Sequence, residues 1–366
     1  MDKRELIMLQ SLPLDIKIAK SKQRIREAID YFGVDGLYVP ISGGLDSAVL
    51  SDIVYQVQKE LGIKKKSIPR VNSNTRNEYP GVLKMARKLS DEEVMPNKSP
   101  YELWREIGYP VASKKISRMI RDLQNPTDNN VATRRLYLEG IKKDGTKGSS
   151  RCKLAKRWYT FIDEDEEIKI KCSEKCCNIV KKAPLHEYEK RTRRHPLIAT
   201  MADEGGTREQ GYLQTGCNAF ARGKSMPIGF WTKQDILRYY VEYPLEYAEE
   251  YGDIVELEDG TLDTTGEKRT GCFSCMMGVQ MEKGENRFQR MKRLYPKMYK
   301  HCIEGGKVNE EGCWVPKNGL GLGYVLDRMG VEYGDYEKSP EELKIKKVLR
   351  HPKPKKIKKK KKKKKK

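Results

Sequence analysis

The sequence predicts an α/β fold with a doubly wound parallel sheet, and two observations support this prediction. Strand-like apolar segments at 37–41, 67–73 and 92–96 alternate with segments whose apolar residues recur at helical spacing. Because a strand–helix–strand order needs crossover connections, which are nearly always right-handed, these strands are expected to run parallel. A later apolar segment, 195–201, is expected to rejoin the sheet.

The helices follow from the spacing of apolar residues between these strands. In the first of them Ile25, Ile29 and Phe32 share one face, and the glycines at 33 and 36 end it. The helices expected in this part of the chain span residues 16–32, 46–61, 81–90 and 109–123.

Composition divides the chain into four parts. We expect an N-terminal extension at 1–20, a core domain at 21–245, a helical cysteine-containing region at 246–341 and a disordered lysine-rich tail at 342–366. Within the core domain, the turn-rich stretches "NPTDNN" and "KKDGTKGSS" predict a helical and loop insertion at about 121–165.

The overall composition excludes some classes of protein. The chain is 37% hydrophobic with a mean hydropathy of −0.78, and it has no run of about 18 apolar residues, so a membrane span is not expected. Its first residues show no uninterrupted apolar core of an export signal. Nine cysteines in such a chain predict a reducing, cytoplasmic setting and metal or redox use rather than disulfides.

The net charge of +22 is concentrated at one end. Twelve of the positive charges are lysines of residues 351–366, which leaves +10 for the other 350 residues. Such a tail attracts any polyanion in a salt-dependent way, and a passive appendage is the alternative.

The stretch "YVPISGGLDSAVLSDIV" predicts a phosphate-binding loop. Ser42, Gly43 and Gly44 allow a tight turn with exposed N–H groups between a strand and a helix, whose N-terminus favours anions. Ser47 would add a hydroxyl donor, and Asp46 would hold Mg²⁺ or cap the helix. An ordinary strand–turn–helix with Asp46 as its cap is the alternative. The stretch fits neither the Walker pattern nor the dinucleotide pattern.

A second loop is expected beside the first. Residues 72–80, "NSNTRNEYP", follow the second predicted strand as 42–47 follow the first. Ligands of open parallel sheets bind beyond the carboxyl ends of the strands, so both loops are expected to face one pocket.

Four cysteines form two pairs that would hold a metal group. Cys176 and Cys177 are adjacent, and Cys272 and Cys275 follow after 94 intervening residues. Four thiolates suit a 4Fe–4S cluster or Zn²⁺, and adjacent cysteines favour the larger cluster because their side chains diverge. Unliganded cysteines are the third possibility.

Several segments resemble the phosphoadenosine phosphosulfate (PAPS) reductase family of the adenine nucleotide alpha-hydrolase-like superfamily. The loop "SGGLDS" resembles the superfamily's pyrophosphate loop. The segments "GYPVASKK", "EKCCNIVKKAPLHEYEK", "ATMADEGGTREQ", "MPIGFWTKQDILRYY" and "TGCFSCMMG" resemble PAPS reductase family proteins, especially the compact kind of phage and bacterial mobile DNA. The likeness runs from about residue 20 to 335.

This resemblance implies a Rossmann-like nucleotide-binding domain, an adenine nucleotide (PAPS, APS or ATP) and sulfur-related redox or transfer chemistry. It implies that Cys176, Cys177, Cys272 and Cys275 hold a 4Fe–4S cluster, and that the electron donor is thioredoxin-like. The implied catalytic residues are Asp46, Lys114 and Arg208, and the implied nucleotide-binding residues are Ser42, Gly43, Gly44, Asp46 and Ser47. Lys224 is a further candidate phosphate or sulfate partner, whereas Trp231 is expected to pack in the core.

Departures from the family favour other reactions. The reductases use a cysteine thiolate in a C-terminal Glu-Cys-Gly-like motif, which is absent; Cys302 and Cys313 are the late cysteines. The intact "SGGLDS" has the form used by enzymes that split ATP to AMP and pyrophosphate. Gly205 and Gly206 replace bulkier polar residues beside Glu204 and Arg208. An adenylating enzyme for sulfur incorporation into a nucleic-acid acceptor is therefore one alternative, and a catalytically inert nucleic-acid-binding protein is another.

Overall fold

A four-stranded, all-parallel sheet lies at the centre of a mixed α/β structure, a computed structural model that describes residues 2–337 and 344–352. The sheet order is β3-β2-β1-β4. Val39 of β1 aligns with Arg70 of β2, and Leu37 aligns with His195 of β4. The strands are β1 (Leu37–Ile41), β2 (Arg70–Ser73), β3 (Glu92–Val94) and β4 (His195–Pro196).

The predicted strands are present but shorter than the apolar segments. Only two residues of the expected strand 195–201 pair with β1. In the second segment Arg70 begins the paired strand, because residues 65–67 form a short 3-10 turn before it. The prediction of an α/β fold with a parallel sheet is confirmed.

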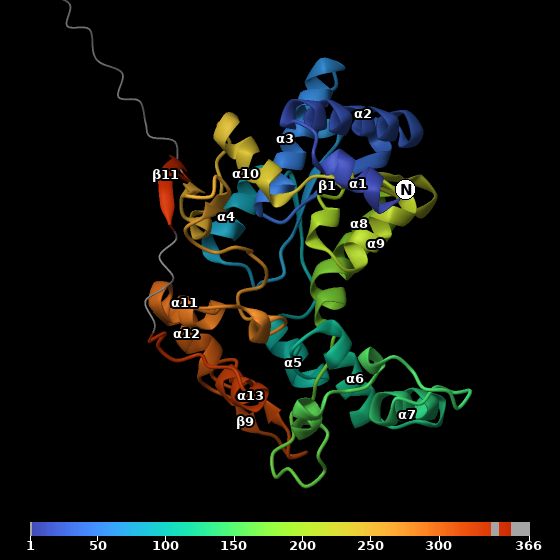
Figure 1. The fold of residues 1–366 in the computed structure, drawn as a ribbon, viewed down its shortest axis with the longest axis vertical. Coiled ribbons are helices and arrows are strands. Elements are labelled where there is room, and N and C mark those ends of the chain that lie inside the picture. Colours follow the sequence, from blue (N-terminus) through green and yellow to red (C-terminus); the bar gives the residue numbers. More distant parts are fainter. Residues whose placement is uncertain (1, 338–343, 353–366) are drawn as a thin grey trace, which may run out of the picture.

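Helices α1 (Lys3–Gln10), α2 (Leu14–Phe32), α3 (Leu45–Glu60) and α4 (Pro80–Leu89) build the N-terminal half around the sheet (Figure 1). Helix α2 ends at Gly33, whose φ of 74° favours glycine. It runs through residues 20 and 21, where we expected a boundary. In α3, Val49, Ile53 and Val57 are fully buried. Each such side chain stabilises the fold by about 1.5–3 kcal/mol, which fixes α3 against β1.

The segment between β3 and β4 carries four helices: α5 (Pro100–Ile107), α6 (Lys114–Gln124), α7 (Val131–Glu139) and α8 (Ala183–Thr192). Helix α6 begins later than the predicted 109, because Tyr109 forms a bridge with Cys172 and Ser113 caps the helix through the Ile116 N–H. The insertion expected at about 121–165 therefore starts inside α6. Helices α6 and α7 lie away from the sheet, at the lower right of Figure 1.

The chain beyond β4 adds α9 (Thr207–Thr215), α10 (Lys233–Glu242) and three helices at the lower left of Figure 1, α11 (Arg287–Leu294), α12 (Pro296–Ile303) and α13 (Leu322–Met329). Its short strands are β5 (Asn218–Ala219), β6 (Lys224–Ser225), β9 (Lys307–Val308) and β10 (Trp314–Val315). The remaining helical turns are η1 (Val34–Gly36), η2 (Lys65–Ser67), η3 (Asp128–Asn130), η4 (Ser150–Cys152), η5 (Lys156–Phe161), the π-helix η6 (Asn178–Lys182), η7 (Ala202–Glu204), η8 (Phe220–Arg222), η9 (Glu249–Tyr251) and η10 (Val279–Met281).

An antiparallel sheet corrects our expectation for the end of the chain. Its order is β11-β7-β8, with β7 (Ile254–Leu257), β8 (Leu262–Thr264) and β11 (Ile345–Arg350). The prediction of a disordered tail at 342–366 is wrong for 345–350, because this stretch, "IKKVLR", contains three apolar residues and pairs with β7. Residues 342–343 and 353–366 of that predicted tail lie outside the described residues.

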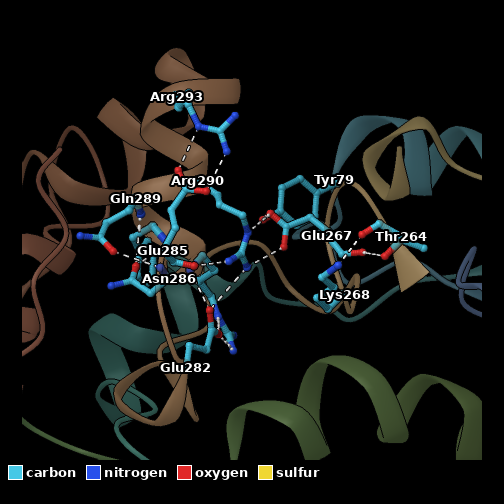
Figure 2. Close-up of polar contacts among 12 residues, drawn as sticks. Tyr79, Thr264, Glu267, Lys268, Glu282, Glu285, Asn286, Gln289, Arg290 and Arg293 are labelled. Carbon is cyan, nitrogen blue, oxygen red and sulfur yellow. Dashed lines mark hydrogen bonds and ion pairs between the residues drawn. The ribbon is translucent and has the colours of Figure 1, made fainter. Parts of the chain in front are cut away.

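An ion network on α11 holds the segment that contains the second cysteine pair. Arg290 Nη2 lies 3.1 Å from Glu267 Oε2 and 3.5 Å from Glu282 Oε2 (Figure 2). The hydroxyl of Tyr79 donates to Glu267 Oε1 at 3.5 Å. Because Glu267 is only 3% exposed, its carboxylate depends on this guanidinium for compensation. The network therefore ties residues 267–282 to α11 and to the loop before α4.

No helix within 2–337 and 344–352 is both long and apolar enough to cross a lipid bilayer.

Candidate nucleotide and cysteine site

The loop between β1 and α3 has the tight geometry that its glycines predict. Gly43 has φ of 74°, and a Cβ there would lie 2.3 Å from the carbonyl oxygen of Val82. Gly44, at the N-cap of α3, has no side-chain cap. The alternative in which Asp46 caps the helix is therefore wrong, and its carboxylate is left for another role.

The side chains of the two serines, Ser42 and Ser47, form hydrogen bonds within the loop. Their hydroxyl oxygens are 3.2 Å apart, and the N–H of Gly44 donates to Ser42 Oγ at 3.3 Å. The hydroxyl of Ser47 donates to the Gly44 carbonyl at 3.0 Å. These short-range bonds fix the turn at the start of α3, where first-turn N–H groups favour an anion.

A cavity of about 530 Å³ opens beside this loop. It brings together Ser42, Asp46 and Ser47 with three residues far along the chain, Glu204, Arg208 and Lys224. The other lining residues are Tyr38, Pro40, Lys182, Leu185, His186, Glu189, Pro196, Ile198, Ala199, Thr200, Arg222 and Gly223.

Three predicted residues lie outside the wall of this cavity. Gly43 and Gly44 form the turn behind it, and Gly43 faces α4. Lys114 is the first residue of α6 and is exposed to solvent. The structure therefore does not place Lys114 with Asp46 and Arg208, because Ser113 begins a separate helix there.

The cavity wall carries four cationic side chains and three carboxylates, those of Asp46, Glu189 and Glu204. Lys182, Arg222 and Lys224 have no ion pair among the described residues, whereas Arg208 pairs with Glu204. Burial lowers the pKa of Arg208, and the nearby Arg269 lowers it further. Unpaired cations around one cavity favour a ligand with several negative charges.

Asp46 is the one carboxylate within residues 42–47. Burial raises the pKa of Asp46 to about 6, and the charges of Arg208 and Arg269 oppose this rise. No hydrogen bond or ion pair holds its carboxylate within the described residues. A partly buried carboxylate without a protein partner is suited to a divalent cation, which prefers oxygen ligands.

Sequence reasoning missed Lys182, Arg222 and the pair Tyr38–Glu189. The Tyr38 hydroxyl donates to Glu189 Oε1 at 2.7 Å on the cavity side of β1. Lys182 lies in the cysteine-containing segment that we interpreted only for its metal ligands. The only sequence feature that could have pointed to Lys182 as a cavity residue was its position six residues after Cys176.

The structure brings the two cysteine pairs together. Cys176 and Cys177 precede the π-helix η6, and the N–H of Cys275 donates to the Cys272 carbonyl at 3.1 Å. Burial raises the pKa of Cys176 to about 12, and negative charge on Cys272, Cys177 and Cys275 adds to this rise. The loop after β2 contacts both segments, since the Ser73 hydroxyl donates to the Lys181 carbonyl at 3.1 Å and Thr75 Oγ1 lies 3.8 Å from Cys272 Sγ.

Polar groups surround these sulfurs. The indole N–H of Trp104 donates to Cys176 Sγ at 3.4 Å, and Thr75 Oγ1 lies 3.8 Å from Cys272 Sγ. Burial also raises the pKa of Cys275, to about 11. Negative charge on Cys272, and to a smaller extent on Cys177 and Cys275, raises the pKa of Lys181.

These observations fit a cofactor with negative charge. Four thiolates around a 4Fe–4S cluster leave net negative charge, which Lys181 and the two donors would stabilise. Among the described residues, no three or more His, Cys, Asp or Glu side chains are placed to enclose a single metal ion.

The loop after β2 contacts the cysteines rather than the cavity. Asn77 and Ser274 exchange two side-chain hydrogen bonds of 2.7 and 2.9 Å, and the Ser73 hydroxyl donates to the Lys181 carbonyl at 3.1 Å. No residue of 72–80 lines the cavity. Our prediction that both loops face one pocket is therefore wrong, because the second loop joins the two cysteine segments.

Tyr251 connects the two parts of the site. Its hydroxyl lies 2.6 Å from Thr270 Oγ1 and accepts the N–H of Leu45 at 3.4 Å. Thr270 is two residues before Cys272, and Leu45 is the first residue of α3. The buried Tyr251 hydroxyl therefore links the start of α3 to the segment that contains the second cysteine pair.

Trp231 and three cysteines outside the two pairs are buried. Trp231 packs in the core, where its indole N–H donates to Ser21 Oγ at 3.0 Å. Cys172 and Cys217 are buried. Burial raises the pKa of Cys302 to about 12, so a thiolate nucleophile is disfavoured there.

Comparison with known proteins adds no family. No protein-family model and no curated protein sequence matches this chain. The proposals below therefore rest on the geometry of the site and on the resemblance of its motifs.

Proposed function

We propose that this chain is an enzyme of the PAPS reductase type that binds an adenine nucleotide beside residues 42–47 and acts in sulfur chemistry. The observation that supports it most is the cavity wall, which joins Ser42, Asp46 and Ser47 to Arg208 and Lys224. We also propose that the parallel sheet has a doubly wound, Rossmann-like arrangement. The order β3-β2-β1-β4 reverses direction between β1 and β4, and ligands of such sheets bind at that point.

The chain's own residues would bind and orient the nucleotide. First-turn N–H groups of α3 and the Ser42 and Ser47 hydroxyls would hold phosphate oxygens. Arg208 and Lys224 would contact further phosphate or sulfate oxygens from the opposite wall. Charge that develops on a leaving pyrophosphate would then meet donors that are already in position.

Asp46 would position Mg²⁺. Its carboxylate, which has no partner among the described residues, would hold the ion beside the bound phosphate groups. This role agrees with the exclusion of Asp46 from helix capping.

Cys176, Cys177, Cys272 and Cys275 would hold a 4Fe–4S cluster, and Zn²⁺ is the alternative. When bound, the cluster would supply electron transfer or would shape the pocket from its cysteine side. Trp104 and Thr75 would donate to its sulfur ligands, and Lys181 would offset its charge.

The nucleotide proposal is tested by titration of anaerobically purified protein with ATP, PAPS and APS, with and without Mg²⁺. We expect saturable binding of at least one nucleotide, and weaker binding by Asp46→Asn. Equal affinity of the wild type and Asp46→Asn for every nucleotide would contradict the proposed site.

The products distinguish the reductase from its alternative. With PAPS and a reduced thioredoxin-like donor, a reductase releases sulfite, and the donor dithiol supplies the two electrons. With ATP, Mg²⁺ and a nucleic-acid acceptor, an adenylating enzyme releases pyrophosphate. An oxygen of the acceptor forms a bond to the α-phosphorus, and the bond between the α-phosphorus and the oxygen that bridges to the β-phosphate breaks. Burial of the late cysteines Cys302 and Cys313 favours the second reaction, because the reductase thiolate must reach its substrate.

The alternative outside the enzymes is a catalytically inert protein that binds nucleic acid. This alternative predicts that Asp46→Asn leaves cellular function intact. We also propose a cytoplasmic location, because thiols stay reduced there and the proposed cluster needs reduced cysteines as ligands.

A further inference from the structure

A basic arm, residues 131–157, projects from the side of the molecule opposite the antiparallel sheet. It contains nine lysines and arginines but only two acidic residues, Glu139 and Asp144. The arm comprises α7 and the loops that follow it, which lie at the lower right of Figure 1, away from the parallel sheet. Its charge is independent of the lysine-rich end of the chain.

The arm has a defined backbone. Ile141 and Lys147 form an antiparallel bridge, the N–H of Lys142 donates to the Thr146 carbonyl at 2.9 Å, and Gly145 takes the positive φ of the turn. The N–H of Leu154 donates to the Tyr137 carbonyl at 2.8 Å, and the side chain of Leu154 is buried. The cations of the hairpin are therefore presented on a folded support.

Most of these cations have no acidic partner. Within the arm the described residues contain one ion pair, Arg135–Glu139, and Asp144 accepts hydrogen bonds from Thr146 in the turn. The exposed cations without an ion pair among the described residues are Lys142, Lys143, Lys147, Arg151, Lys153, Lys156 and Arg157.

We propose that this arm binds the phosphate backbone of nucleic acid without sequence preference. Binding to a polyphosphate backbone needs cations at close spacing and no apolar anchor, because release of condensed counterions drives it. The inference goes beyond the proposed nucleotide chemistry and does not depend on it.

The composition of the hairpin favours nucleic acid over a membrane or an acidic protein. Residues 142–153 expose no large apolar side chain, whereas interfacial membrane binding buries such side chains and protein interfaces depend on apolar or aromatic anchors. The exposed apolar residues of the arm, Val131 and Leu138, both lie on α7.

The test compares two triple variants of the full chain. Lys142→Ala, Lys143→Ala and Lys147→Ala together remove three cations of the hairpin. Lys20→Ala, Lys84→Ala and Lys297→Ala together remove three exposed cations from α2, α4 and α12 and match the change in net charge. The lysine-rich end is present in all three proteins, so its contribution is common to them.

Fluorescence anisotropy measures binding to labelled duplex DNA, single-stranded DNA and duplex RNA at several salt concentrations. We expect the hairpin variant to bind each at least about tenfold more weakly, and its slope of log affinity against log salt to fall by about 2–3, since each lost phosphate contact contributes about 0.9. The control variant is expected to change that slope by less than about 1.

Three outcomes would overturn the proposal. Equal weakening by both variants would show that net charge rather than the arm binds the nucleic acid, and no weakening by the hairpin variant would exclude its role. Tighter binding of wild type to vesicles of anionic lipid than to any nucleic acid, lost only in the hairpin variant, would assign the arm to a membrane. The melting temperature of each variant is also measured. Values equal to that of the wild type establish that a loss of binding does not come from a loss of folding.

Discussion

The phosphate loop and the cysteine group are built over very different distances along the chain. Hydrogen bonds among the serines and glycines of the loop join residues at most five positions apart, such as Ser42 and Ser47. Those around the cysteines join Trp104 to Cys176 and Thr75 to Cys272, which are 72 and 197 positions apart. Changes in the loop should therefore alter ligand binding while the fold persists, whereas changes at the cysteines should disturb both the cofactor and the packing of distant segments.

The largest effect is expected from Cys272→Ser. Loss of one of four thiolate ligands should reduce iron and acid-labile sulfide from about four per chain to less than one, because the cluster needs all four ligands. Iron and sulfide are measured on anaerobically purified protein together with the visible spectrum.

Cys152→Ser is the matched control, since Cys152 is only half-buried and lies outside the four-cysteine group. Full iron content in Cys272→Ser, or one zinc per chain without sulfide in the wild type, would contradict the cluster.

The next effect is expected from Asp46→Asn in the loop. Loss of the carboxylate should weaken Mg²⁺-dependent nucleotide binding by about 10- to 100-fold, an effect typical of groups that hold or orient a metal. Isothermal titration measures it with and without Mg²⁺. An equal loss in the absence of Mg²⁺ would show that Asp46 acts on the nucleotide by another route.

A comparison of Arg208→Ala with Lys114→Ala tests the position of the cavity. Arg208→Ala should weaken nucleotide binding by about tenfold, because a hydrogen bond to a charged group contributes about 1.5–3 kcal/mol. Lys114→Ala should change it by less than about twofold, because Lys114 lies outside the cavity wall. Nucleotide titration of both variants measures the difference, and a larger loss in Lys114→Ala would show that the ligand lies near α6.

The pKa of Asp46 predicts a gain in stability for the same Asp46→Asn variant without ligand. The folded-state pKa of about 6 lies above the ordinary value of 3.8, so the charged form is favoured in the unfolded chain. The variant should be more stable by about 3 kcal/mol above pH 6, and this difference should disappear below about pH 4. Urea unfolding at several pH values measures it; a constant difference across that range would contradict the shift.

The smallest effect is expected from Tyr251→Phe, which removes the link between the two regions. Loss of a buried hydroxyl with two partners should lower the free energy of unfolding by about 1 kcal/mol. Tyr55→Phe is its control, because Tyr55 is exposed. Urea unfolding compares the two variants, and an equal effect would indicate that the Tyr251 hydroxyl makes no net contribution.

Sequence patterns identified much of the fold and part of the site. Apolar spacing predicted β1, α3 and the parallel sheet, and the site motifs placed Ser42, Asp46 and Arg208 in one cavity. They misplaced Lys114, because a residue near a motif in the chain need not lie near it in space. They also missed β11, whose basic residues resembled the tail that follows it.

The sequence by itself determined the turn between β1 and α3, because Gly43 and the neighbouring serines act on residues within hydrogen-bonding reach along the chain. It also predicted an anionic ligand for this turn and a common role for the four cysteines. Only the tertiary structure decided that Lys182 and Arg222 line the cavity, and that residues 72–80 join the cysteine segments instead of facing the ligand. The physical reason is that local backbone preferences depend on near neighbours, whereas a cavity wall depends on how distant helices pack.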